Sequence, residues 1–323
     1  MADARRRARQ GAIALLVSGG LLALVFSQMD TDAALARLRE ADWRLIGLSF
    51  VLSFAVLIVR GLRFRFLTSQ SPFSSVIAAI AGQNFLNRVA PFRLGELSLP
   101  YLLHRTTGEP PATSLIMLVL VRLIELWALF VTAIGAVLGW FGGAEAERVV
   151  LLAAIAAALG LTLLTFRRWL GLGLRLADAL ARRTGLAERG AVRNALDRVH
   201  EAATGDARLT LRQHAALLLG TVAIMALQFA LYGCLLRSLG FALHPLQIIV
   251  GVTAAQVAGA LPVLSVGSVG THETGWAAGF VWVGLALPDA VMTGVYTQVV
   301  TLAFAVVFAG PAALWWVRRR RDG

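Results

Sequence analysis

Long apolar runs without a single charged residue constrain this chain more than any other feature. Asp, Glu, Lys and Arg are absent from residues 10–29, 45–59, 126–144, 149–166, 213–236, 238–272, 274–288 and 290–317. A helix needs about 20 apolar residues to cross a bilayer, and each charge at its centre costs about 2.5–3.5 kcal/mol on insertion scales. With 58% apolar and 15% charged residues, the chain is too apolar for a soluble domain. We therefore predict an all-α, polytopic transmembrane helix bundle of about 7–8 spans, built as a single membrane domain over residues 1–323.

The basic residues predict how the chain is oriented. All 30 of them are arginines, against 18 acidic residues. They gather in the N-terminus before residue 10, a turn around Arg60, Arg63 and Arg65, the connection 167–213, and the tail at 318–321. Positive connections of membrane proteins stay in the cytoplasm, so we expect both termini there, in a multi-pass protein of the inner (cytoplasmic) membrane. With both termini on the same side, the number of membrane crossings must be even. We obtain an even number only if the segment 72–104 enters and leaves the membrane from the cytoplasmic side.

The connection 167–213 has a pattern of its own, with ten arginines and five acidic residues. Leu172, Leu176 and Leu180 recur at helical spacing, and arginines occupy the other faces. This pattern is typical of an amphipathic helix that lies on an anionic membrane surface. Because the positive charge is confined to the cytoplasmic connections, we expect membrane lipids and not nucleic acid as the partner of this segment.

Two segments, one in each half of the chain, break the apolar pattern. The first is 72–104 and the second is 246–288; each combines Pro, Gly and Glu with amides or hydroxyls. Irregular backbone at membrane depth is tolerated only where it is buried in protein or lines a watery cavity. Such a pair of breaks is typical of a transporter site at the midplane, and an inverted repeat would account for it. The candidate substrate-binding residues in these breaks are Asn84, Asn87, Arg88, Arg93, Glu96, Ser268, Thr271 and Glu273.

Arg122 and Glu125 form a third candidate site within an otherwise apolar segment at 113–140. At positions i and i+3 they share a helix face, so they can neutralise each other inside the bundle. The sequence leaves two roles open, a structural ion pair and a contact to the substrate. Arg88 and Arg93 of the first break could bind phosphate oxygens, and Glu96 and Glu273 could accept a cationic group or a proton.

Motifs for catalysis, metal binding and cofactor binding are missing. Cys234 is the only cysteine, and His272 has no second histidine at metal spacing. Asp30 and Asp32 resemble acids of enzymes that act on lipid-linked sugars, but they also suit the first turn of a helix. We expect no metal and no cofactor, and the sequence favours a protein without catalysis while leaving the enzyme class open.

Several motifs together resemble one family. They are Arg60 to Phe66, Asn87-x-x-x-Pro91-x-Arg93-x-Gly95-Glu96, Arg122-x-x-Glu125, and the late Pro262, Gly270 and Glu273. This combination is similar to the transmembrane region of the lysylphosphatidylglycerol synthases, the flippase-like membrane family. The chain departs from the family pattern at two places. Val121 stands before Arg122 where the family has Glu, and residues 265–270 stand where the family has Pro-Gly-Gly-x-Gly.

The resemblance implies that lipids, or lipid-linked molecules, are moved between leaflets. Larger relatives carry a soluble aminoacyltransferase domain after the membrane part, and we expect this chain to lack it. The implied partners are membrane lipids, as an anionic or lipid-linked substrate. The alternative is a membrane enzyme, or an assembly partner of one, that acts on lipid-linked sugars or aminoacylated phospholipids.

Overall fold

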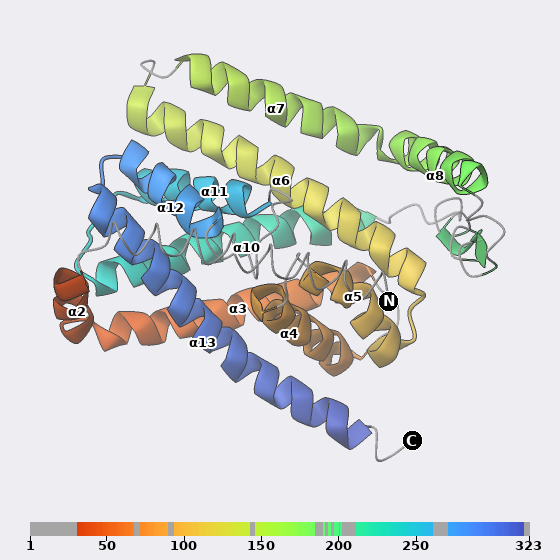
Figure 1. Cartoon of the computed structure of the whole chain (residues 1–323), viewed down its shortest axis with the longest axis horizontal. Helices are drawn as coiled ribbons and strands as arrows, with labels where there is room; N and C mark the ends of the chain where they lie inside the picture. Colours follow the sequence, from red (N-terminus) through yellow and green to blue (C-terminus); the bar gives the residue numbers. More distant parts are fainter. Residues whose placement is uncertain are drawn as a thin grey trace.

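The protein is built from α-helices throughout the part of the chain that its computed structural model describes. The described residues are 31–67, 72–89, 94–142, 146–184, 211–260 and 271–319, with short pieces between 190 and 201. The span predicted at 10–29 lies outside them. The helices are α2 (Thr31–Arg39), α3 (Trp43–Leu67), α4 (Phe73–Val89), α5 (Leu94–Thr107), α6 (Pro111–Phe141), α7 (Ala146–Leu164), α8 (Phe166–Arg183), α10 (Leu211–Ser238), α11 (Pro245–Ala260), α12 (Thr271–Trp282) and α13 (Leu287–Arg319) (Figure 1).

Five of the described helices are long and apolar enough to cross a membrane, namely α3, α6, α7, α10 and α13. A helix of 25 residues, the length of α3, extends for about 37 Å, which exceeds the hydrocarbon thickness of a bilayer. Large apolar side chains cover their outer surfaces; Val51, Leu161, Leu219 and Val222 are each about 60–70% exposed. Lipid is the medium in which such a surface is stable, so the predicted polytopic membrane bundle is confirmed.

Helices α3 and α10 lie antiparallel and in close contact. The amide of Asp42 donates to the carbonyl of Ser238 at 2.9 Å, and the hydroxyl of Ser49 to the carbonyl of Leu231 at 3.4 Å. These contacts define one end of the bundle, here called the α2 end, because α2 is also there. The opposite end, here called the α8 end, holds the end of α3 and the beginning of α6 (Figure 1).

Helices α4 and α5 form the first hairpin, which enters the bundle from the α8 end and returns to it. They have 17 and 14 residues, too few for either to cross a bilayer alone. At the tip of the hairpin the two helices approach so closely that a Cβ atom on Gly95 would overlap the backbone of Asn87. The predicted return of the segment 72–104 to its starting side is thus the path that the chain takes.

Helices α11 and α12 form the second hairpin, which enters from the α2 end. Gln247 at the start of α11 donates to the carbonyl of Val283 after α12 at 2.8 Å, and Trp282 stacks on Phe141 at the end of α6. Small residues let the two helices approach: a Cβ atom on Gly279 would lie 2.6 Å from the Cβ of Ala254. Such contacts replace the hydrophobic effect as the cause of helix association in lipid.

Two separate apolar clusters hold the bundle together. The cluster at the α2 end contains Trp276 and Phe280 of the second hairpin with Leu235 of α10. The cluster at the α8 end contains Ile80 and Leu99 of the first hairpin with parts of α3 and α6. Each hairpin therefore packs into its own end of the bundle, and polar side chains remain for the region between the two clusters.

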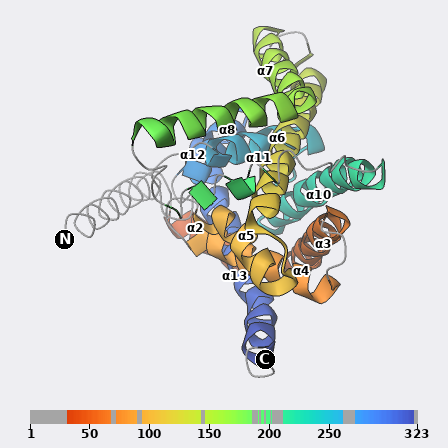
Figure 2. The ribbon, with the colours of Figure 1, turned by 90° about the vertical axis from the view of Figure 1, so that its right-hand side faces the viewer.

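Helix α8 lies across the α8 end of the bundle. Figure 1 shows it nearly end-on and Figure 2 shows it along its length, so it runs roughly perpendicular to α7. Leu172, Leu176 and Leu180 are exposed on it, as are Arg175 and Arg182. This is the geometry of the amphipathic helix predicted from the connection 167–213, although most of that connection after residue 184 lies outside the described residues.

Candidate functional site

A cavity of about 480 Å³ lies inside the bundle between the two hairpins. Side chains from α3, α4, α5, α6, α10, α11, α12 and α13 line it. Its charged lining residues are Arg60, Arg88, Glu96, Arg122 and Glu125. Its neutral polar lining residues include Asn84, Asn87, Gln228, Tyr232, Gln256, His272, Gln298 and Thr301. A hollow with this lining is unusual in a membrane bundle, where ionisable side chains mark functional sites.

The described flanks of both breaks border this cavity. Asn87 and Glu96 flank the first break, whose residues 90–93 lie outside the described part of the chain. Ala260 and His272 flank the second break, of which 261–270 are likewise not described. The sequence predicted that the two breaks converge on one polar cavity, and their flanks do meet there.

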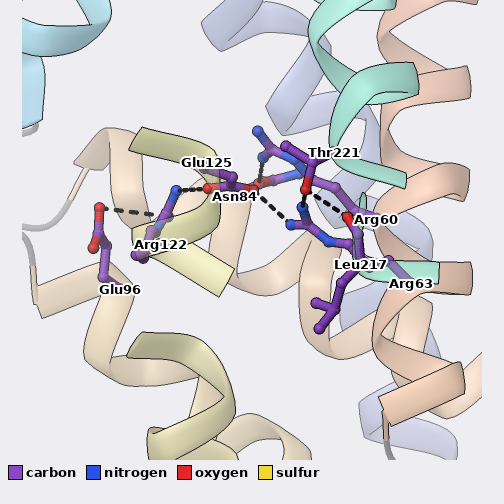
Figure 3. Close-up of polar contacts among 8 residues, drawn as sticks. All are labelled: Arg60, Arg63, Asn84, Glu96, Arg122, Glu125, Leu217 and Thr221. Atoms are coloured by element: carbon purple, nitrogen blue, oxygen red, sulfur yellow. Dashed lines mark hydrogen bonds and ion pairs between the residues drawn. The ribbon is translucent and has the colours of Figure 1, made fainter. Parts of the chain in front are cut away.

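An ion-pair network crosses the wall of the cavity (Figure 3). Arg122 contacts Glu125 at 2.8 Å within α6, which confirms the pair predicted at i and i+3. The same arginine reaches Glu96 of the first hairpin at 3.4 Å, and Arg63 of α3 contacts Glu125 at 2.5 Å. Arg122 thus contacts both glutamates, Glu125 is shared by arginines of α3 and α6, and the network ties the first hairpin to α3 and α6.

Arg63 and Arg60 correct the sequence analysis, which placed them with Arg65 in a basic cytoplasmic turn. Helix α3 continues to Leu67, and only Arg65 of the three is exposed. Arg63 is 3% exposed; besides Glu125 it binds the hydroxyl of Thr221 on α10 at 3.1 Å. Arg60 and Arg63 lie three residues apart and share a helix face. That spacing, together with the intramembrane Glu125, is the sequence signal that could have identified Arg60 and Arg63 as residues inside the bundle.

Arg60 and Arg88 differ from the other two arginines in their partners. Arg60 donates to the amide oxygen of Asn84 at 3.0 Å. Arg88, at the end of α4, donates to the hydroxyl of Thr301 on α13 at 3.0 Å. Among the described residues, no carboxylate lies within ion-pair distance of either arginine. Both cations therefore face the cavity with neutral partners only.

Several polar atoms of the lining are buried and make no hydrogen bond to the described part of the chain. They are Nε of Arg60, Nε of Arg122, Nε2 of Gln256, Oδ1 of Asn87 and Nδ1 of His272. Buried polar groups are normally paired, and leaving one unpaired costs about 1–3 kcal/mol. Their concentration on one cavity indicates that water or a polar ligand completes them.

The remaining candidates lie elsewhere. Arg93 and Ser268 fall outside the described residues. Glu273 is 2% exposed, and neither it nor Thr271 is among the described residues that line the cavity. Its place is taken by His272, one position earlier on α12. The described residues contain no group of three His, Cys, Asp or Glu side chains that could hold a metal.

Sequence reasoning missed the neutral residues that α10, α11 and α13 contribute to the lining. Gln228, Gln256 and Gln298 lie within apolar helices, and Tyr232 and Thr301 are common in such helices. Glutamines inside the apolar stretches of α10, α11 and α13 are the signal that could have identified these residues, because an amide in a membrane helix forms hydrogen bonds to polar partners on other helices.

Comparison with known proteins agrees with this architecture. No curated protein and no solved structure matches the chain. The family described as the lysylphosphatidylglycerol synthase TM region matches residues 11–309, which is nearly the whole chain and includes both hairpins and the entire cavity lining. This polytopic helical membrane protein therefore belongs to the lysylphosphatidylglycerol synthase TM region family.

Proposed function

We propose that the protein moves a lipid, or a lipid-linked molecule, between the two leaflets of its membrane without changing it covalently. The observation that carries this proposal is the polar cavity, in the middle of an apolar bundle, between two hairpins that enter from opposite ends. The family makes a lipid-related role in the membrane the starting point; translocation is the step that we add.

The cost of moving a headgroup explains why such a cavity is needed. A polar or charged headgroup loses its water on entering hydrocarbon, and an unpaired polar group costs several kcal/mol there. The cavity offers guanidinium, carboxylate, amide and hydroxyl groups in place of that water. It also holds buried polar atoms that have no hydrogen-bond partner among the described residues. A headgroup in the cavity would form hydrogen bonds with these atoms. These bonds would offset the loss of water for the headgroup and for the cavity lining.

The apolar part of the lining suits the tails of the same molecule. Leu126, Leu129, Ala305 and Phe308 border the cavity together with its polar residues. Phe308 also meets Phe54, and Phe50 meets Phe304, in an aromatic seam between α3 and α13. These two helices make few other contacts with each other. Acyl chains could remain in the hydrocarbon at this seam while the headgroup occupies the cavity.

Two hairpins from opposite ends offer a simple way to expose the cavity to each leaflet in turn. Movement of the first hairpin would open a path toward the α8 end, and movement of the second toward the α2 end. Transporters with broken helices use rigid-body movements of this kind around a fixed midplane site.

Reconstitution into liposomes tests the proposal. Headgroup-labelled lipids are added to both leaflets, and a membrane-impermeant reagent bleaches the accessible label. Protein-free liposomes should retain the inner-leaflet label, whereas liposomes with the protein should lose it over time. Mass spectrometry of the same lipids checks for covalent change. An altered lipid that accumulates while leaflet exposure stays constant would favour the membrane enzyme instead.

We also propose that the α8 end faces the cytoplasm, because α8 lies there with Arg175, Arg182 and Arg183, and the arginine-rich connection 167–213 begins with this helix. Cysteine labelling in a Cys234→Ala background tests this orientation. Gly190→Cys should react with an impermeant maleimide only in inside-out vesicles. Ala242→Cys, an exposed position at the α2 end, should react on intact cells. The reverse pattern would invert the orientation.

A further inference from the structure

We infer that the cavity selects a ligand whose headgroup carries phosphate and a net negative charge, and that Arg60 and Arg88 bind this phosphate. The inference rests on the proposed function, since it names the class of headgroup that the same cavity would carry. It adds Arg60, which the sequence analysis assigned to a cytoplasmic turn, to the binding residues.

The charges around the cavity do not balance. Among the described residues, the network and the lining together contain four arginines, Arg60, Arg63, Arg88 and Arg122, but only two glutamates, Glu96 and Glu125. Both glutamates are engaged by Arg63 and Arg122. The excess positive charge is thus that of Arg60 and Arg88. A buried charge without a counterion is strongly unfavourable, so an anionic ligand would stabilise the site.

Arg60 and Arg88 retain most of their hydrogen-bonding capacity. A guanidinium group has five N–H donors. Each of the two donates to neutral side chains, Arg60 to Asn84 and Arg88 to Thr301, and Arg88 also has the hydroxyl of Tyr232 as a partner. In addition, Nε of Arg60 is buried without a partner. The free donors of two guanidinium groups on different helices are therefore available to one ligand.

The other incomplete atoms favour acceptor-rich ligands as well. Nε of Arg122 and Nε2 of Gln256 are buried N–H donors without an acceptor, whereas Oδ1 of Asn87 is an acceptor without a donor. Nδ1 of His272 is also unpaired and can donate or accept, depending on its tautomer. A phosphate group presents several strong acceptor oxygens in a tetrahedral arrangement, which lets two arginines on different helices bind it together. A headgroup with net positive charge would instead meet two cations that have no counterion.

Native mass spectrometry of the full-length protein in detergent tests the inference. The probes are three lipids with identical acyl chains: an anionic phosphodiester, a zwitterionic lipid, and a lipid with a cationic aminoacylated headgroup. We expect the anionic lipid to bind at least tenfold more tightly than the other two. Arg60→Gln and Arg88→Gln should each reduce this preference by about tenfold, as expected for a hydrogen bond to a charged group.

Arg105 provides a matched control. It is exposed in the last turn of α5, on the same hairpin as Arg88, and lies outside the cavity. Arg105→Gln should leave the preference unchanged. Arg88→Lys keeps the charge but loses the planar fork, so it should fall between wild type and Arg88→Gln. Thermal unfolding of each variant identifies any that fails to fold. If either Arg60→Gln or Arg88→Gln does not fold, the lipid preference of the other variant tests the inference.

Three outcomes would overturn the inference. The first is equal binding of the anionic and zwitterionic lipids. The second is a preference that survives in both cavity variants or is lost in Arg105→Gln, which would indicate adsorption to the outer surface. The third is binding of inorganic phosphate as tightly as the anionic lipid, which would make the ligand a soluble phosphate compound.

The leaflet assay, run on the same lipids, separates this inference from the proposed function. If the protein binds the anionic lipid through Arg60 and Arg88 but moves no lipid, translocation fails and the binding site stands. If it moves all three lipids at equal rates, the selectivity fails and translocation stands.

Discussion

The two hairpins reach one cavity from opposite ends of the bundle, yet they bring different chemistry to it. The first hairpin contributes Arg88 and Glu96, and its neighbours α3 and α6 contribute the other charged residues of the lining. The second hairpin contributes His272 and Gln256, and its neighbours α10 and α13 contribute neutral amides and hydroxyls. All formally charged lining residues therefore come from the first half of the chain.

The hairpins also differ in what holds them. The ion pair between Glu96 and Arg122, with hydrogen bonds, ties the first hairpin to its neighbours, whereas contacts between small residues such as Gly279 and Ala254 hold the two helices of the second hairpin together. Similar topology thus serves two tasks. The first hairpin and its neighbours, which carry the charged residues, are suited to binding a headgroup. The second hairpin, with its small residues, is suited to close packing that leaves no room for a larger side chain.

The largest effect is expected from Glu125→Gln, which removes the shared partner of Arg63 and Arg122. Breaking a buried ion pair leaves an uncompensated charge, and we expect a loss of about 3 kcal/mol in stability. Thermal unfolding in detergent, followed by circular dichroism, measures it. The control is Glu147→Gln, an exposed position in the first turn of α7. Equal unfolding temperatures of the two variants would show that the stability of the protein does not depend on this ion-pair network.

The next largest effect is expected from Gly279→Leu in the second hairpin. Its Cβ atom alone would come 2.6 Å from the Cβ of Ala254, and overpacking of this kind costs about 1–3 kcal/mol. Gly135→Leu on α6 is the control, because a Cβ atom there meets nothing within 4 Å. The same unfolding measurement applies. A Gly279→Leu protein as stable as Gly135→Leu would remove the argument for small-residue packing.

The third prediction compares one glutamate from each hairpin. Glu96 lines the cavity and Glu273 does not. Glu96→Gln should therefore slow lipid movement in liposomes at least tenfold, which corresponds to about 1.4 kcal/mol. The rate with Glu273→Gln, normalised to folded protein, should stay within a factor of two of wild type. Comparable losses in both variants would indicate that the hairpins share the transport chemistry equally.

The smallest effect concerns Glu109, in the loop by which the chain leaves the first hairpin; the exit of the second hairpin, 283–286, has no ionisable side chain. Partial burial raises the pKa of the Glu109 carboxyl above its ordinary value. The folded protein therefore holds this proton more tightly than the unfolded chain, and stability falls as the pH rises from the ordinary pKa through the raised one.

Glu109→Gln should remove that loss. We expect a gain below about 0.5 kcal/mol at neutral pH, as is usual for a partly solvated position, and no difference below pH 4 or so. Unfolding temperatures of both proteins across this pH range provide the measurement. A gain that is independent of pH would show that the side-chain shape, and not its charge, is responsible.

Parts of the site that depend on local spacing could be predicted from the sequence. Arg122 and Glu125 pair because residues three apart share a helix face. Pro and Gly interruptions indicated where helices end, and both breaks do flank the cavity. By contrast, Arg63 contacts Glu125 from 62 positions away, and Arg88 contacts Thr301 from 213 positions away. No local pattern contains those partners.

The sequence by itself determined the class of fold, because charge-free apolar runs of sufficient length can only be stable as membrane helices. It also determined where the two hairpins break. Only the tertiary structure decided which side chains point into the cavity, and Glu273 with its neighbour His272 illustrates this. In water, apolar periodicity marks the face that a helix buries. In a bilayer both lipid and protein interior are apolar, so this signal is faint, and the packing of each helix against its neighbours selects the inward face.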